Sequence, residues 1–127
     1  MRAKRILALD SGAGCAFGLM LFALHPIFVR LWGFSEILVW FLAATHLSYG
    51  VGSGLLLTYA RRRQSIPRRG LMTLIVGNIA WGLFCVGLLA YLWPDATIIG
   101  RGQLVIEALF VAGLGVVEYR WAHPESA

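Results

Sequence analysis

The sequence predicts an all-α, membrane-embedded four-helix bundle, and composition, apolar run length and the placement of basic residues all favour that fold. The 127 residues are 59% hydrophobic and 13% charged, with a mean hydropathy of +0.75. Soluble domains have about 45–50% apolar and about 25% charged residues. Because too few polar residues remain to cover a water-facing surface, we expect the surplus apolar surface to face lipid.

Four apolar runs reach the length of about 20 residues that a helix needs to cross the hydrocarbon core. They cover residues 6–28, 36–58, 71–92 and 97–117 of a single transmembrane domain, 1–127. Short connectors force consecutive helices to pack as antiparallel neighbours. The predicted topology is therefore up-down-up-down.

Residues at the ends of these runs have the chemistry of helix boundaries. Ser35 can cap the second helix, and Asp95 or Thr97 can cap the fourth. Pro67 falls near the start of the third helix, where its missing N–H costs nothing. Pro26 lies inside the outer end of the first helix and is expected to bend it.

The basic residues predict the orientation, because cytoplasmic segments of membrane proteins carry an excess of lysine and arginine. With the amino terminus inside, nine basic residues are cytoplasmic and two, Arg30 and Arg101, are outside. Both termini are then cytoplasmic, in a multi-pass protein of the cell (inner) membrane. The nine are Arg2, Lys4, Arg5, Arg61, Arg62, Arg63, Arg68, Arg69 and Arg120. Aromatic residues mark the same boundaries, with Trp32, Tyr91 and Trp93 outside and Tyr59, Tyr119 and Trp121 inside.

Five arginines of one connector form a basic loop: Arg61, Arg62, Arg63, Arg68 and Arg69. We expect the loop to lie against anionic headgroups of the lipid bilayer, at about 1 kcal/mol for each arginine. It is a topology signal first, and a docking site for a partner second. Because the net charge of +5 is concentrated beside apolar runs, it does not indicate a nucleic-acid partner.

Two pairs of glycines predict close helix packing. Gly14 and Gly18 on the first helix, and Gly50 and Gly54 on the second, are each four residues apart. Small residues at this spacing let membrane helices approach closely. The favoured interpretation is packing within one chain; the alternative is a face that recruits a membrane-protein partner or a second copy.

A set of polar residues inside the predicted spans is the candidate functional site: Asp10, His46, Tyr49, Asn78, Gln103 and Glu107. At about 1.5 Å of rise per residue, Glu107 lies near the midplane. Because ionisable groups at this depth cost about 2.5–3.5 kcal/mol on insertion scales, they are usually buried and paired. We expect Glu107 to contact His46, Tyr49 or Asn78, with Gln103 one turn away on the same face.

Three roles are open for this midplane carboxylate. It can hold helices together, bind a proton or cation during transport, or help to dock a larger membrane complex. The first is favoured. The sequence contains no phosphate-binding loop, nucleophile elbow or HExxH motif and no metal-ligand spacing, so we expect no enzyme activity, cofactor or metal.

A short internal repeat pairs Ala16-Phe17-Gly18-Leu19 with Ala80-Trp81-Gly82-Leu83. Internal repeats do occur in membrane transporters. Among apolar residues, however, chance readily produces a match of this length, and chance is the favoured explanation here.

Asn78 and Trp81 in the third helix, with Glu107 and Glu118 in the fourth, resemble the pattern of small four-helix bacterial inner-membrane proteins of unknown function. The resemblance implies a location in the inner membrane but does not imply any particular activity. The first hypothesis is therefore a non-enzymatic accessory or structural subunit of a membrane assembly. The alternative is a small homo-oligomeric transporter or channel that uses Glu107.

Overall fold

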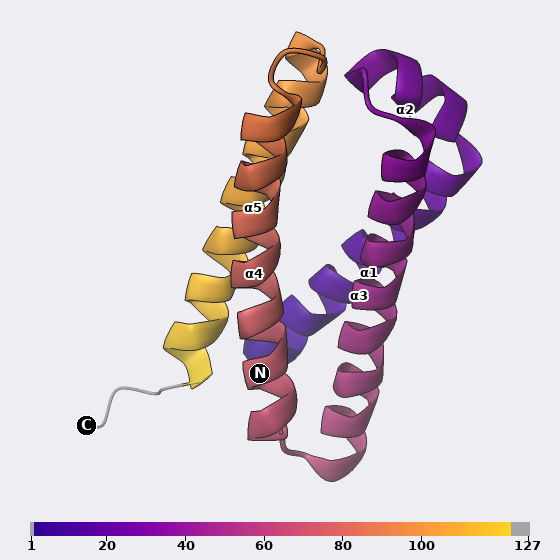
Figure 1. Cartoon of the computed structure of the whole chain (residues 1–127). Helices are drawn as coiled ribbons and strands as arrows, with labels where there is room; N and C mark the ends of the chain where they lie inside the picture. The colour runs from indigo at the N-terminus through magenta and orange to yellow at the C-terminus, as the bar shows by residue number, and fades with distance from the viewer. Residues whose placement is uncertain (1, 123–127) are drawn as a thin grey trace. The chain divides into compact units, whose positions relative to one another are not determined.

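The computed structural model describes residues 2–122, and this part of the chain is all-helical, without strands. Its five helices are α1 (Arg2–Ala23), α2 (His25–Trp32), α3 (Glu36–Arg63), α4 (Arg68–Leu92) and α5 (Ile98–Ala122) (Figure 1). Four of them, all but α2, are long and apolar enough to cross a membrane. The prediction of four span-length helices is confirmed.

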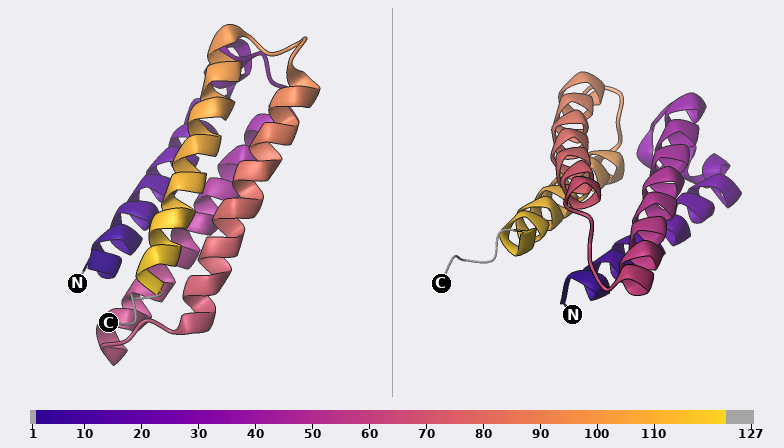
Figure 2. Two further views of the ribbon diagram at one scale, coloured as in Figure 1. Left: turned by 90° about the vertical axis from the view of Figure 1, so that its left-hand side faces the viewer. Right: turned by 90° about the horizontal axis from the view of Figure 1, so that it is seen from below.

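The chain divides into two compact units, which are described separately below. The first, Met1–Ile66, contains α1, α2 and α3; the second, Pro67–Ala127, contains α4 and α5. Each unit is a helical hairpin. In the first, α1 crosses α3 (Figure 1); in the second, α4 and α5 run alongside each other (Figure 2).

The first predicted helix, 6–28, is two helices in the structure. The first helix ends at Ala23, Leu24 is non-helical, and α2 begins at His25 with a proline in its first turn. Pro26 has no N–H to donate to the preceding turn, so the continuous helix ends before it. The expected bend is thus a break. Gly33 then ends α2 in the left-handed conformation, with φ of 70°.

The other helices extend beyond the predicted apolar runs. The second run was expected to end at residue 58, but α3 continues through its three terminal arginines to Arg63. Likewise α4 begins at Arg68, before the predicted 71. Hydropathy reports only the hydrocarbon-spanning part, whereas backbone hydrogen bonding continues until a residue such as Gln64, at φ 55°, ends the helix.

Two of the predicted caps are present. The Oγ of Ser35 accepts a hydrogen bond of 3.2 Å from the backbone N–H of Leu38 at the start of α3. Of the two candidates for the fourth span, Thr97 is the cap, because its Oγ1 accepts from Gly100 N–H at 3.0 Å. Both bonds satisfy backbone donors that the first turn of a helix leaves open.

Candidate functional site

Glu107 is held at the α4–α5 interface by two neutral donors. The indole N–H of Trp81 donates to Glu107 Oε1 at 2.6 Å, and Gln103 Nε2 donates to Oε2 at 3.4 Å. The glutamate is only 6% exposed. A buried carboxylate is costly unless hydrogen bonds satisfy its oxygens, so these contacts explain how α5 accommodates it.

A second carboxylate lies on the same face of α5. Glu118 is 3% exposed, and its Oε2 accepts a hydrogen bond of 2.9 Å from the Asn78 side-chain amide on α4. Eleven residues are about three helical turns, so Glu107 and Glu118 project in nearly the same direction. Val111 and Gly115, both buried, lie between them on this face.

The third buried carboxylate lies in the first unit. Asp10 of α1 is 8% exposed and accepts a hydrogen bond from the Ser53 hydroxyl of α3. One residue further on, Ser11 donates from Oγ to the backbone oxygen of Gly50 at 2.7 Å. Two adjacent side chains of α1 therefore bond to α3, one to a side chain and one to the backbone.

The four glycines lie where α1 and α3 approach each other. A Cβ on Gly14 would lie 2.9 Å from the Cα of Gly50, and one on Gly18 would lie 3.0 Å from a backbone oxygen of α3. A Cβ on Gly54 would lie 2.7 Å from a serine hydroxyl of α1. The small-residue packing that the spacing predicts is thus present between these helices.

The predicted polar set falls into separate groups. Glu107 and Gln103 are bonded to each other, whereas Asn78 is bonded to Glu118. Asp10, His46 and Tyr49 belong to the first unit. The ring of His46 contacts Phe17 edge-on, with centroids 4.8 Å apart, and Tyr49 is half-buried on α3.

A side-chain contact between a histidine and a glutamate links α2 to the start of α3. His25 Nε2 lies 3.3 Å from Glu36 Oε1, and the imidazole packs on Trp40 with centroids 4.6 Å apart. His25 Nδ1 lies 3.2 Å from the backbone oxygen of Phe22. These contacts hold the short helix α2 against α3, directly after the non-helical residue Leu24.

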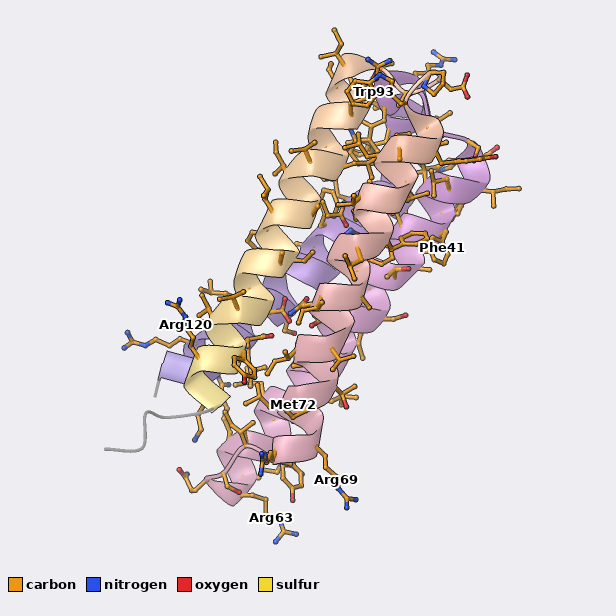
Figure 3. The ribbon with its side chains drawn as sticks, turned by 60° about the vertical axis from the view of Figure 1, so that its left-hand side comes forward. Phe41, Arg63, Arg69, Met72, Trp93 and Arg120 are labelled. Carbon is orange, nitrogen blue, oxygen red and sulfur yellow. The ribbon has the colours of Figure 1, made fainter. Side chains whose placement is uncertain are left out.

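In each unit most of the basic residues lie at the open end of the hairpin, the end opposite the connection between its long helices. Lys4 Nζ, near the start of α1, lies 3.5 Å from Gln64 Oε1, just after α3 ends. In the second unit, Arg69 and Arg120 lie at one end of α4 and α5 and Trp93 at the other (Figure 3). The guanidinium of Arg101 lies 4.5 Å from the centre of a Trp93 ring, a cation–π contact at the turn. The side chains of Arg2 and Trp121, predicted to mark the cytoplasmic boundary, lie outside the described residues.

Sequence reasoning missed the partners more than the carboxylates. Ser53 was not recognised as the partner of Asp10, nor was the Trp81 indole as a donor to Glu107. The signal available for α5 was spacing, because residues 104, 107, 111, 115 and 118 repeat every three or four positions. That pattern identifies the interface face on which both glutamates lie.

Chemically, the three buried carboxylates are acceptors that join pairs of helices. In the interhelical contacts described above, the donor is a neutral side chain: a hydroxyl, an amide or an indole. Among the described residues no cluster of three or more His, Cys, Asp or Glu side chains has the geometry of a metal site. Comparison with protein-family models, curated proteins and solved structures finds no match for this chain in any of the three.

Proposed function

We propose that this chain is an integral protein of the cell (inner) membrane that crosses the bilayer four times, with both termini in the cytoplasm. Four span-length apolar helices support the crossings. The open end of each hairpin carries most of its basic residues, which supports a cytoplasmic location for these ends. Because residues 64–67 connect α3 to α4, that short connector keeps the two basic ends on one side of the bilayer.

Cysteine labelling tests this orientation. In a chain whose Cys15 and Cys85 are replaced by alanine, Ser65→Cys should react with an impermeant reagent only after the cytoplasmic side is opened. Asp95→Cys, in the turn before α5, should react in intact cells. Labelling of the residue 65 variant in intact cells would overturn the orientation.

Within the membrane, we assign the chain the role of a non-enzymatic accessory or structural subunit. The observation that carries this proposal is that Asp10, Glu107 and Glu118 each bond to a side chain of the partner helix. Such bonds hold helices in a fixed register, because a carboxylate separated from its donor in hydrocarbon is penalised. Buried polar groups used in this way supply shape and rigidity.

Purification in mild detergent tests the subunit role. The tagged chain should co-purify with a second, unrelated membrane protein in stoichiometric amount. Independent preparations should contain the same second protein. Glu107→Gln, which keeps an acceptor oxygen, should preserve that association. Isolation of a homo-oligomer that contains only this chain would contradict the proposal.

The alternative is a small homo-oligomeric transporter or channel, and one observation favours it. The hydrogen-bond donors to Glu107 from Trp81 and Gln103 are neutral, so proton uptake would not break an ion pair with either. In this case Glu107→Gln should fold but lose proton- or cation-coupled flux in proteoliposomes. Unchanged flux in that variant would exclude Glu107 as the coupling residue.

A further inference from the structure

The two units repeat one interhelical contact, with a sequence offset of 64 for the residue on the first helix and 65 for the residue on the second. In the first, a Cβ on Gly18 would lie 3.0 Å from the backbone oxygen of Ala43. In the second, a Cβ on Gly82 would lie 3.5 Å from the backbone oxygen of Ala108. Gly82 follows Gly18 by 64 positions, and Ala108 follows Ala43 by 65. Each glycine of the first helix thus packs against the corresponding carbonyl of the second.

A second glycine contact, formed by the other helix of each hairpin, shows the same two offsets. A Cβ on Gly50 would lie 2.8 Å from Sγ of Cys15, and one on Gly115 would lie 3.5 Å from Cγ1 of Ile79. Gly115 follows Gly50 by 65 positions, and Ile79 follows Cys15 by 64. Two independent contacts therefore give the same interhelical register for both hairpins.

The sequence repeat that was too short to interpret has this same offset. The segment 80–83 (AWGL) follows 16–19 (AFGL) by 64 positions. So does the basic pair at 68–69 relative to the basic pair at 4–5, at the start of the first helix in each hairpin. Gly18 and Gly82 belong to this match, but the contact residues Cys15 and Ile79 and the basic helix starts lie outside it and have the same offset, which a chance match gives no reason to expect.

The connections between the paired helices differ, which makes the shared register more informative. The first hairpin is closed by the short helix α2 and a turn, the second by residues 93–97. Nevertheless, a Cβ on Gly18 would meet Leu47 as well as Ala43, and a Cβ on Gly82 would meet Ala112, 65 positions after Leu47, as well as Ala108. The register is therefore not a consequence of similar turns.

We infer that the chain is a tandem duplication of one helical hairpin, in which each copy begins at a basic helix start. Internal structural repeats are one of the ways in which membrane-protein folds are built. The inference rests on the internal geometry of each unit and is independent of the accessory role.

The duplication relates the two buried polar pairs, Asp10–Ser53 and Asn78–Glu118, as equivalent interhelical hydrogen bonds formed by different residues. Ser53 and Glu118 are equivalent, 65 positions apart, and each bonds to the first helix of its own hairpin. The position equivalent to Asp10 is Leu74, one turn before Asn78. The buried carboxylate has therefore changed helices between the copies, from α1 in the first to α5 in the second.

Placing the Asp10–Ser53 pair at the equivalent positions of the second hairpin, residues 74 and 118, tests the equivalence in the full chain. In a Leu74→Asp background, Glu118→Ser supplies the hydroxyl that Asp10 has at residue 53, and Glu118→Ala does not. The serine variant should have the higher melting temperature, by about the shift that Ser53→Ala causes in the otherwise unchanged chain. Equal melting temperatures for the serine and alanine variants would overturn the inference.

A distance measurement covers the case in which these variants do not fold. In a chain lacking the native cysteines, spin labels at Gly12 and Gly52 lie on open faces of the first hairpin. The equivalent exposed positions of the second are Val76 and Val117. Both label pairs should give the same distance in detergent; a difference larger than one helical turn, about 5.4 Å, would contradict the duplication.

Discussion

The indole nitrogen of Trp81 donates a hydrogen bond of 2.6 Å to Glu107 Oε1 and so joins α4 to α5 at the level of a buried carboxylate. The two residues are 26 positions apart. The contact is between helices, and the same carboxylate also accepts from Gln103 on its own helix. Removing the indole donor therefore weakens an interhelical link but leaves the local one.

We predict that Trp81→Phe destabilises the protein more than Glu107→Gln does. Phenylalanine keeps an aromatic ring but has no N–H, so Glu107 loses a hydrogen bond in a buried site, at a cost of about 1–3 kcal/mol. Glutamine keeps an acceptor oxygen for the indole. Thermal unfolding in detergent measures both variants, and a Trp81→Phe melting temperature equal to that of the wild-type chain would show that the bond contributes nothing.

The pair formed by Asn78 and Glu118 gives a prediction with a defined order. Asn78→Asp places a second carboxylate beside Glu118 and removes the amide donor, so it should destabilise more than Asn78→Leu, which only removes the donor. Glu118→Gln, which keeps an acceptor, is the control and should be the mildest change. Unfolding near neutral pH that ranks Asn78→Asp as the most stable of the three would refute the assignment.

Glycine packing is tested by two positions of α3 that are two residues apart. Gly50→Ile should destabilise strongly, because a Cβ there would lie 2.9 Å from the carbonyl carbon of Gly14. Gly52→Ile is the matched control, since nothing lies within 4 Å of a Cβ at that position. Overpacking typically costs about 1–3 kcal/mol. Similar melting temperatures for the two variants would remove the packing argument.

The helical spans could be predicted from sequence because hydropathy and basic boundaries are properties of continuous segments. The ends could not, since Arg61, Arg62 and Arg63 are polar and yet continue α3 by ordinary backbone hydrogen bonding. The break at Leu24 was anticipated only as a bend. A proline removes one donor, and whether the helix then bends or stops depends on packing that the sequence does not specify.

The sequence predicted which polar residues of the spans belong to the candidate site, but only partly which of them are hydrogen-bonded to each other. Depth along a helix can be counted from sequence, and it placed Glu107 and Asn78 near the same level. Pairing depends on the direction in which each side chain projects, and that direction requires the interhelical register. In the structure Asn78 is hydrogen-bonded to Glu118 and Trp81 to Glu107.

The turn after α2 provides the last prediction, in which two glycine-to-alanine changes have opposite effects. Gly33 has a φ of 70°, a left-handed conformation that costs a residue with a Cβ roughly 1–2 kcal/mol. Gly12 lies within α1 with nothing within 4 Å of a Cβ, so alanine there gains helix propensity of about 0.8–1 kcal/mol. Gly33→Ala should therefore lower the melting temperature in detergent and Gly12→Ala should raise it. A higher melting temperature for Gly33→Ala than for Gly12→Ala would mean that the turn does not require the left-handed conformation.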